Sequence, residues 1–491
     1  MDTAQTSDLS GLKWRGKMLK QVLLASAISL SNTTMAAEKP NIVYLLVDNW
    51  GWGDLSVQGS TIQTPNIDDF AQEGLRLTNF NVQNQCTPTR SALHTGRLPI
   101  RTGNQKVPAP GEPDGLAQWE YTLPELLSDA GYSTALFGKW HVGASIEKLP
   151  NYQGYDYFWG TNEGTNAASY TSTPQWDPEV AETPYIWEGV KGKPAKKVKL
   201  FDIPAKVILD REITERSIAH IQEKAKSGKP FFTYVGFTHF HPPLTVHDDF
   251  KNKSKAGIYA DTQMEVDHNI GLILEAIRKA GVEENTLVIL SGDNGAGNFP
   301  QGSALAAGES GGGGSNGPWR GGLSTAYEGG LRTPAMIRFP GKIEAGRVSD
   351  EIVGDIDMYT TIASFAGAES LVPSDRPIDG VDQKDFFLGK PESNRDHFIV
   401  FVGDELFAVK WRNFKMHFMT AESTHSRIEK FTFPQVFDIK NDPKEAYELL
   451  GNEGYSHTWI FDPVMKRIAD LKSSMHQYRN IQPGEEFKGY E

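Results

Sequence analysis

A continuous apolar run, Asn41-Ile42-Val43-Tyr44-Leu45-Leu46-Val47, is followed directly by Asp48-Asn49 and Gly51. A second run of this kind, Thr286-Leu287-Val288-Ile289-Leu290, ends in Ser291-Gly292-Asp293-Asn294. Short β-branched runs bounded by Gly and Asp are typical of strands that are buried on both faces of a sheet. Both runs therefore predict central strands of one covered sheet.

Helical patterns lie between these two runs. Thr122-Leu123-Pro124-Glu125 is a capping box with Pro in the first turn, and Gly131 is a suitable stop. Residues 208–226 and 259–280 carry helical periodicity. Strand-like segments follow at 134–137 and 231–235. Strands that alternate with helices predict an α/β sandwich around a large, mostly parallel sheet.

The pattern changes near residue 397. Three strand-like segments with short turns follow, at 398–402, 406–410 and 415–418. They predict a small antiparallel subdomain at the C-terminal end. We therefore expect a signal segment at 1–37, a catalytic domain at 38–385 and a smaller subdomain at 386–491.

The N-terminal segment has the features of a secretory signal. Lys17 and Lys20 precede an apolar run at 22–30, and small residues follow up to Ala37. The run is too short to span a bilayer, and no later stretch is long and apolar enough for a membrane helix. The sequence predicts a secreted or periplasmic protein without membrane insertion, and its start is Met1 or Met18.

Charge and cysteine content narrow the class of function. The 491 residues carry a formal net charge of -13, which disfavours nucleic acid or an anionic membrane as the main partner. The chain has one cysteine, Cys86, although secreted chains usually use cysteines in pairs. A lone thiol in an oxidising compartment is buried, reactive or chemically converted, so Cys86 is the first candidate for chemistry.

Cys86 opens the segment Cys86-Thr87-Pro88-Thr89-Arg90-Ser91-Ala92-Leu93-His94-Thr95-Gly96-Arg97. Pro88 suits the first turn of a helix, which places Cys86 at an N-terminus that favours anions. Arg90, one turn later, adds a cation on the same side. Taken alone, a buried structural cysteine beside a surface arginine explains the segment equally well.

Cys-x-Pro-x-Arg followed by Thr-Gly-Arg resembles the signature of the sulfatase family in the alkaline phosphatase superfamily. The resemblance extends from about residue 40 to the C-terminal region and implies an alkaline-phosphatase-like sandwich. It also implies that Cys86 is oxidised to formylglycine (3-oxoalanine), an aldehyde that hydrates to a geminal diol. The partner for this conversion would be a formylglycine-generating or an anaerobic sulfatase-maturing enzyme.

Four oxygen-bearing side chains follow the two apolar runs: Asp48, Asn49, Asp293 and Asn294. Open α/β sheets place ligands at the carboxyl ends of their strands, and these oxygens suit a hard cation such as Ca²⁺. Two ordinary Asx turns are the competing interpretation. The pairs resemble the paired metal ligands of the family, which implies Ca²⁺, with Mg²⁺ second, held together with residue 86. Asn49 departs from the family pattern, in which Asp is more common.

Other family motifs supply candidate catalytic residues. Gly138-Lys139-Trp140-His141 resembles a family motif that implies Lys139 on a sulfate oxygen and His141 as the base. Thr238-His239-Phe240-His241-Pro242-Pro243 contains the His-x-Pro spacing of the family at His241, which implies contact with the ester oxygen and proton donation to the leaving group. His239 competes with His241 for this role.

The segment at 302–322 is rich in Gly and Ser but lacks the Gly-Lys-Ser/Thr ending of a phosphate-binding loop. It predicts a surface loop near the site. In the following family segment, many members carry a sulfate-binding Lys four residues before Tyr327, and this chain has Leu323 there. Arg320 is a candidate replacement, because a guanidinium can bind two sulfate oxygens.

Together these residues predict hydrolysis of a sulfate ester, either an aryl sulfate or a sulfated carbohydrate. Two other functions stay open at this point. One is a phosphatase or phosphonate monoester hydrolase on the same site, and the other is a non-catalytic protein that binds sulfated glycans. The sequence identifies neither the natural substrate nor the oligomeric state.

Overall fold

The computed structural model describes residues 39–109, 111–297 and 313–490. The expected signal at 1–37 and residues 302–312 of the Gly/Ser-rich segment lie outside these residues. The rest of that segment, 313–322, forms turns and irregular loop, as expected. In the described part of the chain, we find no helix with the length and apolar character needed to cross a membrane.

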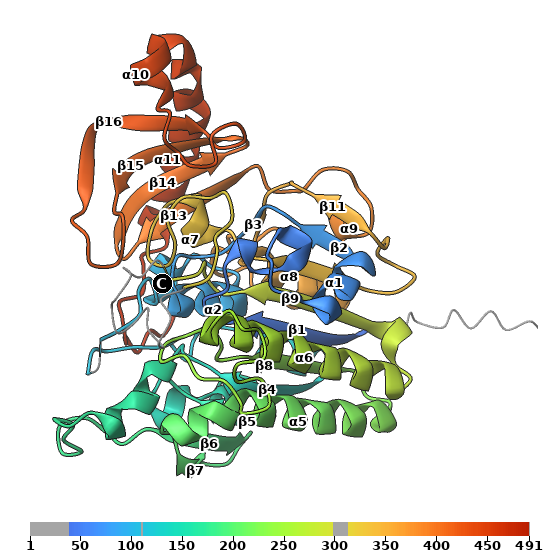
Figure 1. Cartoon of the computed structure of the whole chain (residues 1–491). Helices are drawn as coiled ribbons and strands as arrows, with labels where there is room; N and C mark the ends of the chain where they lie inside the picture. The colour runs from blue at the N-terminus through green and yellow to red at the C-terminus, as the bar shows by residue number, and fades with distance from the viewer. Residues whose placement is uncertain (1–38, 110, 298–312, 491) are drawn as a thin grey trace, which may run out of the picture. The chain divides into compact units, whose positions relative to one another are not determined.

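A large mixed sheet forms the centre of the fold (Figure 1). Its strands are β1 (Asn41–Val47), β2 (Leu75–Leu77), β4 (Ser133–Lys139), β5 (Tyr157–Thr161), β6 (Tyr185–Val190), β7 (Lys196–Leu200), β8 (Phe231–Gly236), β9 (Thr286–Gly292), β10 (Ala335–Arg338) and β11 (Arg347–Ser349). Their order is β11-β2-β10-β9-β1-β8-β4-β5-β6-β7. The five central strands from β9 to β5 are parallel, and antiparallel pairs flank them on both sides.

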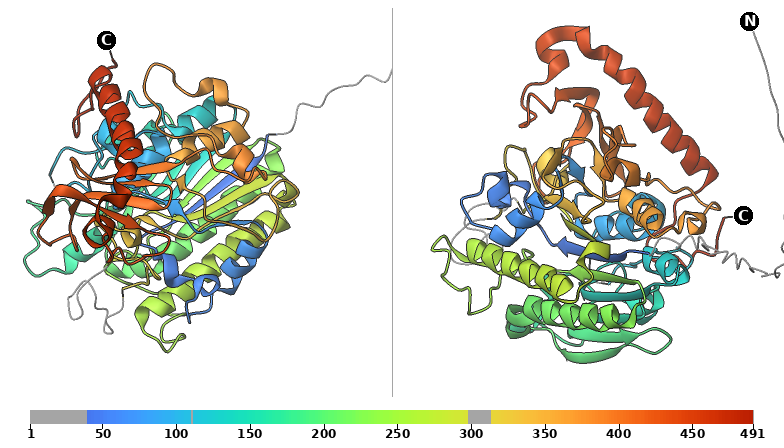
Figure 2. Two further views of the ribbon diagram at one scale, coloured as in Figure 1. Left: turned by 90° about the horizontal axis from the view of Figure 1, so that it is seen from above. Right: turned by 90° about the vertical axis from the view of Figure 1, so that its right-hand side faces the viewer.

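Helices cover both faces of this sheet (Figure 2). One face carries α1 (Pro65–Gln72), α5 (Ile203–Ser227) and α6 (Ile258–Lys279), and the other carries α2 (Cys86–Thr95), α4 (Leu123–Asp129) and α8 (Asp357–Phe365). The other α-helices of the described residues are α3 (Pro99–Thr102), α7 (Glu328–Leu331), α9 (Lys384–Phe387), α10 (Leu449–Glu453) and α11 (Phe461–Gln477). The predicted α/β sandwich with a mostly parallel sheet is confirmed.

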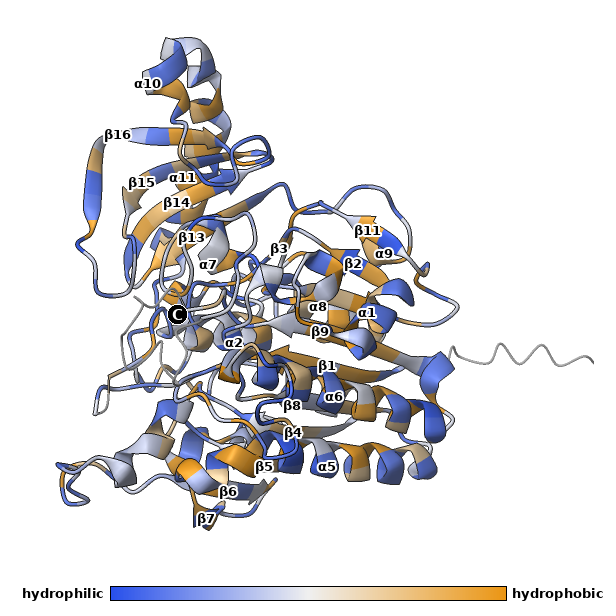
Figure 3. Cartoon of the chain, viewed as in Figure 1, coloured by the Kyte–Doolittle hydropathy of each residue, from blue (hydrophilic) through white to orange (hydrophobic). Residues whose placement is uncertain are grey.

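The side chains of β1 alternate between the two faces of the sheet, and both faces are buried. Ile42, Tyr44 and Leu46 enter one hydrophobic core, while Val43, Leu45 and Val47 enter the other. A strand that buries both faces has no polar side, which is why β1 reads as a continuous apolar run. In Figure 3, α5 and α6 instead alternate between hydrophobic and hydrophilic colouring, as helices with one buried and one exposed face do.

Local sequence signals set the ends of the two helices next to the site. In α4 the Thr122 hydroxyl accepts from the backbone N–H of Glu125, whose carboxylate accepts from the N–H of Thr122, so the predicted capping box is confirmed. Helix α2 begins at Cys86 after an extended residue, and it ends before Gly96, whose φ of 66° is left-handed. Cys86 is thereby placed at the N-terminus of α2.

The C-terminal part forms a separate antiparallel sheet, as predicted. Its strands are β13 (His397–Val402), β14 (Glu405–Trp411), β15 (Phe414–Thr420) and β16 (Glu429–Asp438), in sequential order. The fourth strand was not predicted, because its first half is exposed and mixes charged with aromatic residues. A small sheet pairs β3 (Phe80–Asn81) with β12 (Val353–Gly354). The domain boundary at 385/386 stays a prediction.

Buried ion pairs join the C-terminal sheet to the rest of the fold. Glu328, at the start of α7, is fully buried and accepts from Lys410 at 2.7 Å and from Lys415 at 3.0 Å. Arg332 also donates to the Glu328 carboxylate, and Lys415 Nζ lies 3.6 Å from Glu445 Oε1. Burial lowers the pKa of Lys410 to about 7. Glu328 is therefore the acceptor that keeps these buried cations compensated.

Replacing Glu328 with Gln should destabilise the fold by about 3–5 kcal/mol, because it leaves buried cations without their carboxylate. The matched control is Glu275→Gln, since Glu275 also pairs with two cations, Arg278 and Lys279, but its side chain is 43% accessible to solvent. The control should change the free energy of unfolding by less than about 0.5 kcal/mol. Urea denaturation of both variants measures the difference, and equal effects would contradict the role given to Glu328.

Candidate functional site

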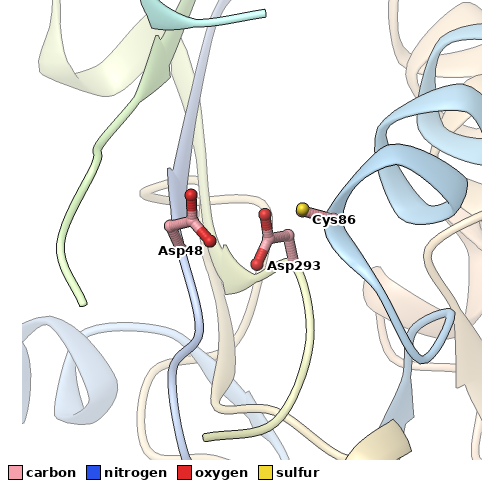
Figure 4. Close-up of side chains that lie close together, drawn as sticks. All are labelled: Asp48, Cys86 and Asp293. Atoms are coloured by element: carbon pink, nitrogen blue, oxygen red, sulfur yellow. The ribbon is translucent and has the colours of Figure 1, made fainter. Parts of the chain in front are cut away.

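The parallel strands bring their carboxyl ends to one edge of the sheet, and the candidate residues lie there. Asp48 follows β1, Asp293 follows β9 and Lys139 is the last residue of β4. Figure 4 shows the Asp48 and Asp293 carboxylates and the Cys86 thiol directed into one common space, with Cys86 at the start of α2. One potential ligand atom from each of these three residues lies within 4.8 Å of the others, and all three residues are buried.

Two cations compensate the two carboxylates. Lys139 Nζ donates to Asp48 Oδ2 at 2.5 Å. Arg90 donates to Asp293 Oδ2 through Nε at 3.1 Å and Nη2 at 2.8 Å, and its Nη2 lies 3.8 Å from Asp48 Oδ2. All four side chains are inaccessible to solvent. The formal charges of this group sum to zero, so it can be buried without a net charge.

The ion pairs also fix the protonation of the cations. Burial by itself lowers the pKa of Lys139, but the Asp48 carboxylate outweighs it and holds that pKa above its usual value. Burial and the neighbouring Asp48 raise the pKa of Asp293. A positive ion between the two carboxylates would relieve this repulsion.

The donor atoms fit a divalent cation. Asp48 Oδ1 and Asn294 Oδ1 are buried and have no hydrogen-bond partner among the described residues. Buried oxygens without donors are ready ligands for a hard cation such as Ca²⁺. Asn49 Oδ1 accepts from Asn294 Nδ2 at 2.7 Å, and its Nδ2 has no partner in the described chain. Asn49 offers its oxygen to an ion if its amide group turns over.

The thiol of Cys86 faces the imidazole of His141, with Sγ and Nδ1 3.2 Å apart. Burial raises the pKa of the Cys86 thiol to about 11. Burial lowers the pKa of His141 well below its usual value, and Lys139 and Arg90 lower it further. The thiol is therefore protonated near neutral pH, so an unmodified Cys86 is poorly suited to act as a thiolate nucleophile.

The structure separates the two competing histidines. His239 is fully buried, and its Nε2 lies 3.1 Å from Asp210 Oδ2 and 3.3 Å from Glu265 Oε2. His241 is half-buried, and its Nδ1 contacts the carbonyl of Pro242 at 2.7 Å. Burial and the positive charges of Lys139 and Lys206 lower the pKa of His241 well below its usual value, and Lys139 belongs to the site. This geometry favours His241 as the residue that faces a substrate.

Arg320 lies apart from this group. Its guanidinium donates to Glu422 at 2.7 Å and to the carbonyl of Glu445 at 2.8 Å, and it covers the ring of Tyr327. Leu323 is half-buried, and its backbone N–H donates to the carbonyl oxygen of Ala296. A sulfate-binding role for Arg320 stays a prediction, and these contacts hold the side chain elsewhere.

Three further residues, which the sequence analysis did not identify, form hydrogen bonds with residues of the site. The hydroxyl of Tyr234, from β8, lies 3.3 Å from Arg90 Nη1. The Thr87 hydroxyl donates to the carbonyl of His141, and the Thr89 hydroxyl donates to that of Asp293. Thr87 and Thr89 fall inside the Cys86 segment, so their place in the motif was the available signal. Nothing in the sequence distinguishes Tyr234 from a core residue.

Comparison with known proteins gives consistent matches over most of the chain. A family model described as Sulfatase matches residues 40–368, and one described as the C-terminal region of aryl-sulfatase matches 393–486. N-acetylgalactosamine-6-sulfatase of Canis lupus familiaris is 32% identical, with 96% of this chain and 91% of that protein covered. Arylsulfatase A of Homo sapiens is 31% identical, with coverages of 96% and 94%. The structure of PsFucS1 sulfatase from Pseudoalteromonas sp. matches with a TM-score of 0.83 and 30% identity, with coverages of 90% and 92%.

Calcium should stabilise the folded protein, because the buried oxygens that lack a hydrogen-bond partner are brought together as ligands for the ion only in the folded state. At a Ca²⁺ concentration of 100 times Kd the gain should be about 2.7 kcal/mol. Asp293→Asn should abolish this gain, whereas the exposed Asp470→Asn should keep it. Thermal denaturation of each protein with and without Ca²⁺ measures the gain. An undiminished calcium effect in Asp293→Asn would contradict the assignment.

Proposed function

We propose that this chain, which belongs to the sulfatase family and is a sulfuric ester hydrolase, cleaves an aryl sulfate or a sulfated carbohydrate through a formylglycine made from Cys86. One observation carries the proposal. Cys86 lies at the N-terminus of α2, within 4.8 Å of two carboxylates that are themselves compensated by Arg90 and Lys139. Such a site suits an anionic ester and a bound cation together.

Formylglycine supplies chemistry that an unmodified side chain lacks: its hydrate offers one hydroxyl to attack sulfur and a second hydroxyl whose deprotonation lets sulfate leave. A serine has no second hydroxyl and would keep the sulfate as a stable ester. The protonated, buried thiol of Cys86 is also a weak nucleophile. Both points support conversion of this residue.

The proposed ligands of the cation are Asp48, Asn49, Asp293, Asn294 and residue 86. Ca²⁺ fits better than Mg²⁺, because these side chains offer several oxygens without the strict octahedral geometry that Mg²⁺ demands. The ion would acidify the nucleophile and stabilise charge on the sulfate oxygens. A divalent ion also turns the neutral group of Asp48, Asp293, Arg90 and Lys139 into a positive one, which favours an anionic substrate.

The remaining steps belong to side chains of the site. Arg90 and Lys139 bind sulfate oxygens and spread the charge that develops on them. His141, kept neutral by burial and by the nearby cations, takes the proton of the second hydroxyl on residue 86, so that the aldehyde re-forms and sulfate leaves. His241 protonates the leaving oxygen. Its pKa lies well below the usual value because of burial, Lys139 and Lys206, and an anionic ester in the site would raise it.

Substrate choice and export complete the proposal. A relative named N-acetylgalactosamine-6-sulfatase supports a sulfated sugar, and a relative named arylsulfatase A supports an aryl sulfate. Arg320 could bind sulfate only after release from Glu422. The N-terminal segment supports secretion or export to the periplasm, with conversion by a formylglycine-generating or anaerobic sulfatase-maturing enzyme.

Mass spectrometry of the peptide that contains residue 86 tests the proposal. In active protein this peptide should have lost its sulfur and carry an aldehyde, and activity should rise in proportion to the converted fraction. Cys86→Ala should lower kcat by on the order of 10³-fold or more, as removal of a covalent nucleophile does. Cys86→Ser should stop at a stable sulfate ester after one turnover.

Aryl sulfate and aryl phosphate should be compared side by side in this assay. Faster turnover of the phosphate would favour the phosphatase alternative. Fully active protein with an intact thiol would contradict the formylglycine proposal.

A further inference from the structure

The segment that carries His241 is held by its backbone. The carbonyl of His239 accepts from the backbone N–H of Asp48 at 2.8 Å. Asp210, on α5, accepts from the N–H of Thr238 at 2.8 Å, from its hydroxyl at 3.0 Å and from the N–H of His239 at 3.1 Å. Residues 238–241 therefore connect α5 directly to a proposed metal ligand.

Lys206 holds the other end of this segment. Its Nζ donates to the carbonyl of His241 at 3.0 Å. Lys206 and Asp210 lie four residues apart on α5, so both side chains leave the same face of the helix. Both are buried, with Lys206 fully inaccessible and Asp210 1% exposed. One face of α5 therefore forms hydrogen bonds with the backbone on both sides of His239, at Thr238 and at His241.

The buried group is balanced in charge. The imidazole of His239 lies between Asp210 and Glu265 of α6, at 3.1 and 3.3 Å. Burial alone would lower the pKa of His239, but these two carboxylates raise it above its usual value. With Lys206, the group has two positive and two negative charges. Balance explains how His239 is buried, but it does not explain the contact of Lys206 with the His241 carbonyl.

Lys206 is unfavourable for stability on its own. The hydrogen bond of its Nζ goes to a carbonyl oxygen, and burial lowers its pKa to about 8. Its positive charge compensates one of the two buried carboxylates, so removal of the amine should cost stability. The amine also fixes the position of the His241 carbonyl, which charge compensation alone does not require.

We propose that Lys206 is a positioning residue for the sulfatase reaction, which holds the His241 imidazole at the leaving oxygen through the His241 carbonyl. Asp210 holds the Thr238–His239 end of the segment through hydrogen bonds, and Lys206 holds its His241 end. The inference rests on the proposed function, because it assigns a partner to the residue that protonates the leaving group. Lys206 itself touches neither the sulfate nor the nucleophile in this account.

The test is a leaving-group series of aryl sulfates from 4-nitrophenyl to phenyl sulfate. A poor leaving group needs its proton and a good one does not, so loss of the acid affects phenyl sulfate most. Lys206→Met should lower kcat/KM for phenyl sulfate by roughly 10- to 100-fold, a part of the 10²–10⁴ that a general acid supplies, and change 4-nitrophenyl sulfate far less. His241→Ala should steepen the series in the same way.

Three controls separate positioning from a structural role. Lys226→Met, on an exposed part of α5, should leave the series unchanged. Lys206→Arg, which keeps a donor, should stay closer to wild type than Lys206→Met. Lys206→Met should lower the thermal midpoint, because a buried carboxylate loses its cation, so the series is measured well below that midpoint. Inhibition by inorganic sulfate should keep the wild-type constant.

The outcomes that would contradict the positioning role of Lys206 differ from those that would contradict the proposed function. An equal loss across the series, or weaker inhibition by inorganic sulfate, would overturn positioning and assign Lys206 to stability or to sulfate binding. An unchanged series in an active protein would overturn this inference alone. A converted wild-type protein without turnover of any sulfate ester would overturn the proposed function and this inference with it.

Discussion

The site depends on two buried ion pairs, Lys139 with Asp48 and Arg90 with Asp293. Carboxylates can face the interior at the end of a hydrophobic sheet only if cations compensate them there. These cations come from β4 and α2, so the pairs also hold a strand and the helix that begins at Cys86 against β1 and β9. Folding and assembly of the charged site are therefore the same event.

Two further buried charge groups follow the same rule with different consequences. Glu328, with Lys410, Lys415 and Arg332, joins the C-terminal sheet to the α/β sandwich. The group around Lys206 and Asp210 instead supports a loop at the site. In the first, loss of one partner should be visible as lost stability. In the second, it should be visible as lost proton transfer in addition to lost stability.

Residues that act locally could be predicted from the sequence, and residues that act through the tertiary fold could not. The strand at 41–47 and the helix that begins at Cys86 follow from short-range apolar patterning and helix-start signals. Lys206 and Asp210 look in the sequence like an ordinary surface pair four residues apart, and only the packing of α5 under 238–241 buries them. The geometry that favours His241 over His239 likewise depends on the positions of Asp210 and Glu265, which the sequence does not show. For Arg320 the sequence suggested a sulfate ligand from its charge and its place in the motif. The structure shows that its guanidinium pairs with Glu422 in the C-terminal part, which the sequence could not show.

A crystal structure of the converted protein with Ca²⁺ tests the central claim most directly. We predict a side chain with two oxygens on residue 86 and an ion at roughly 2.3–2.6 Å from oxygens of Asp48 and Asp293. Arg90 and Lys139 should keep their carboxylate partners. Fully active crystals that show an intact thiol against His141, with no ion between the two carboxylates, would contradict the account.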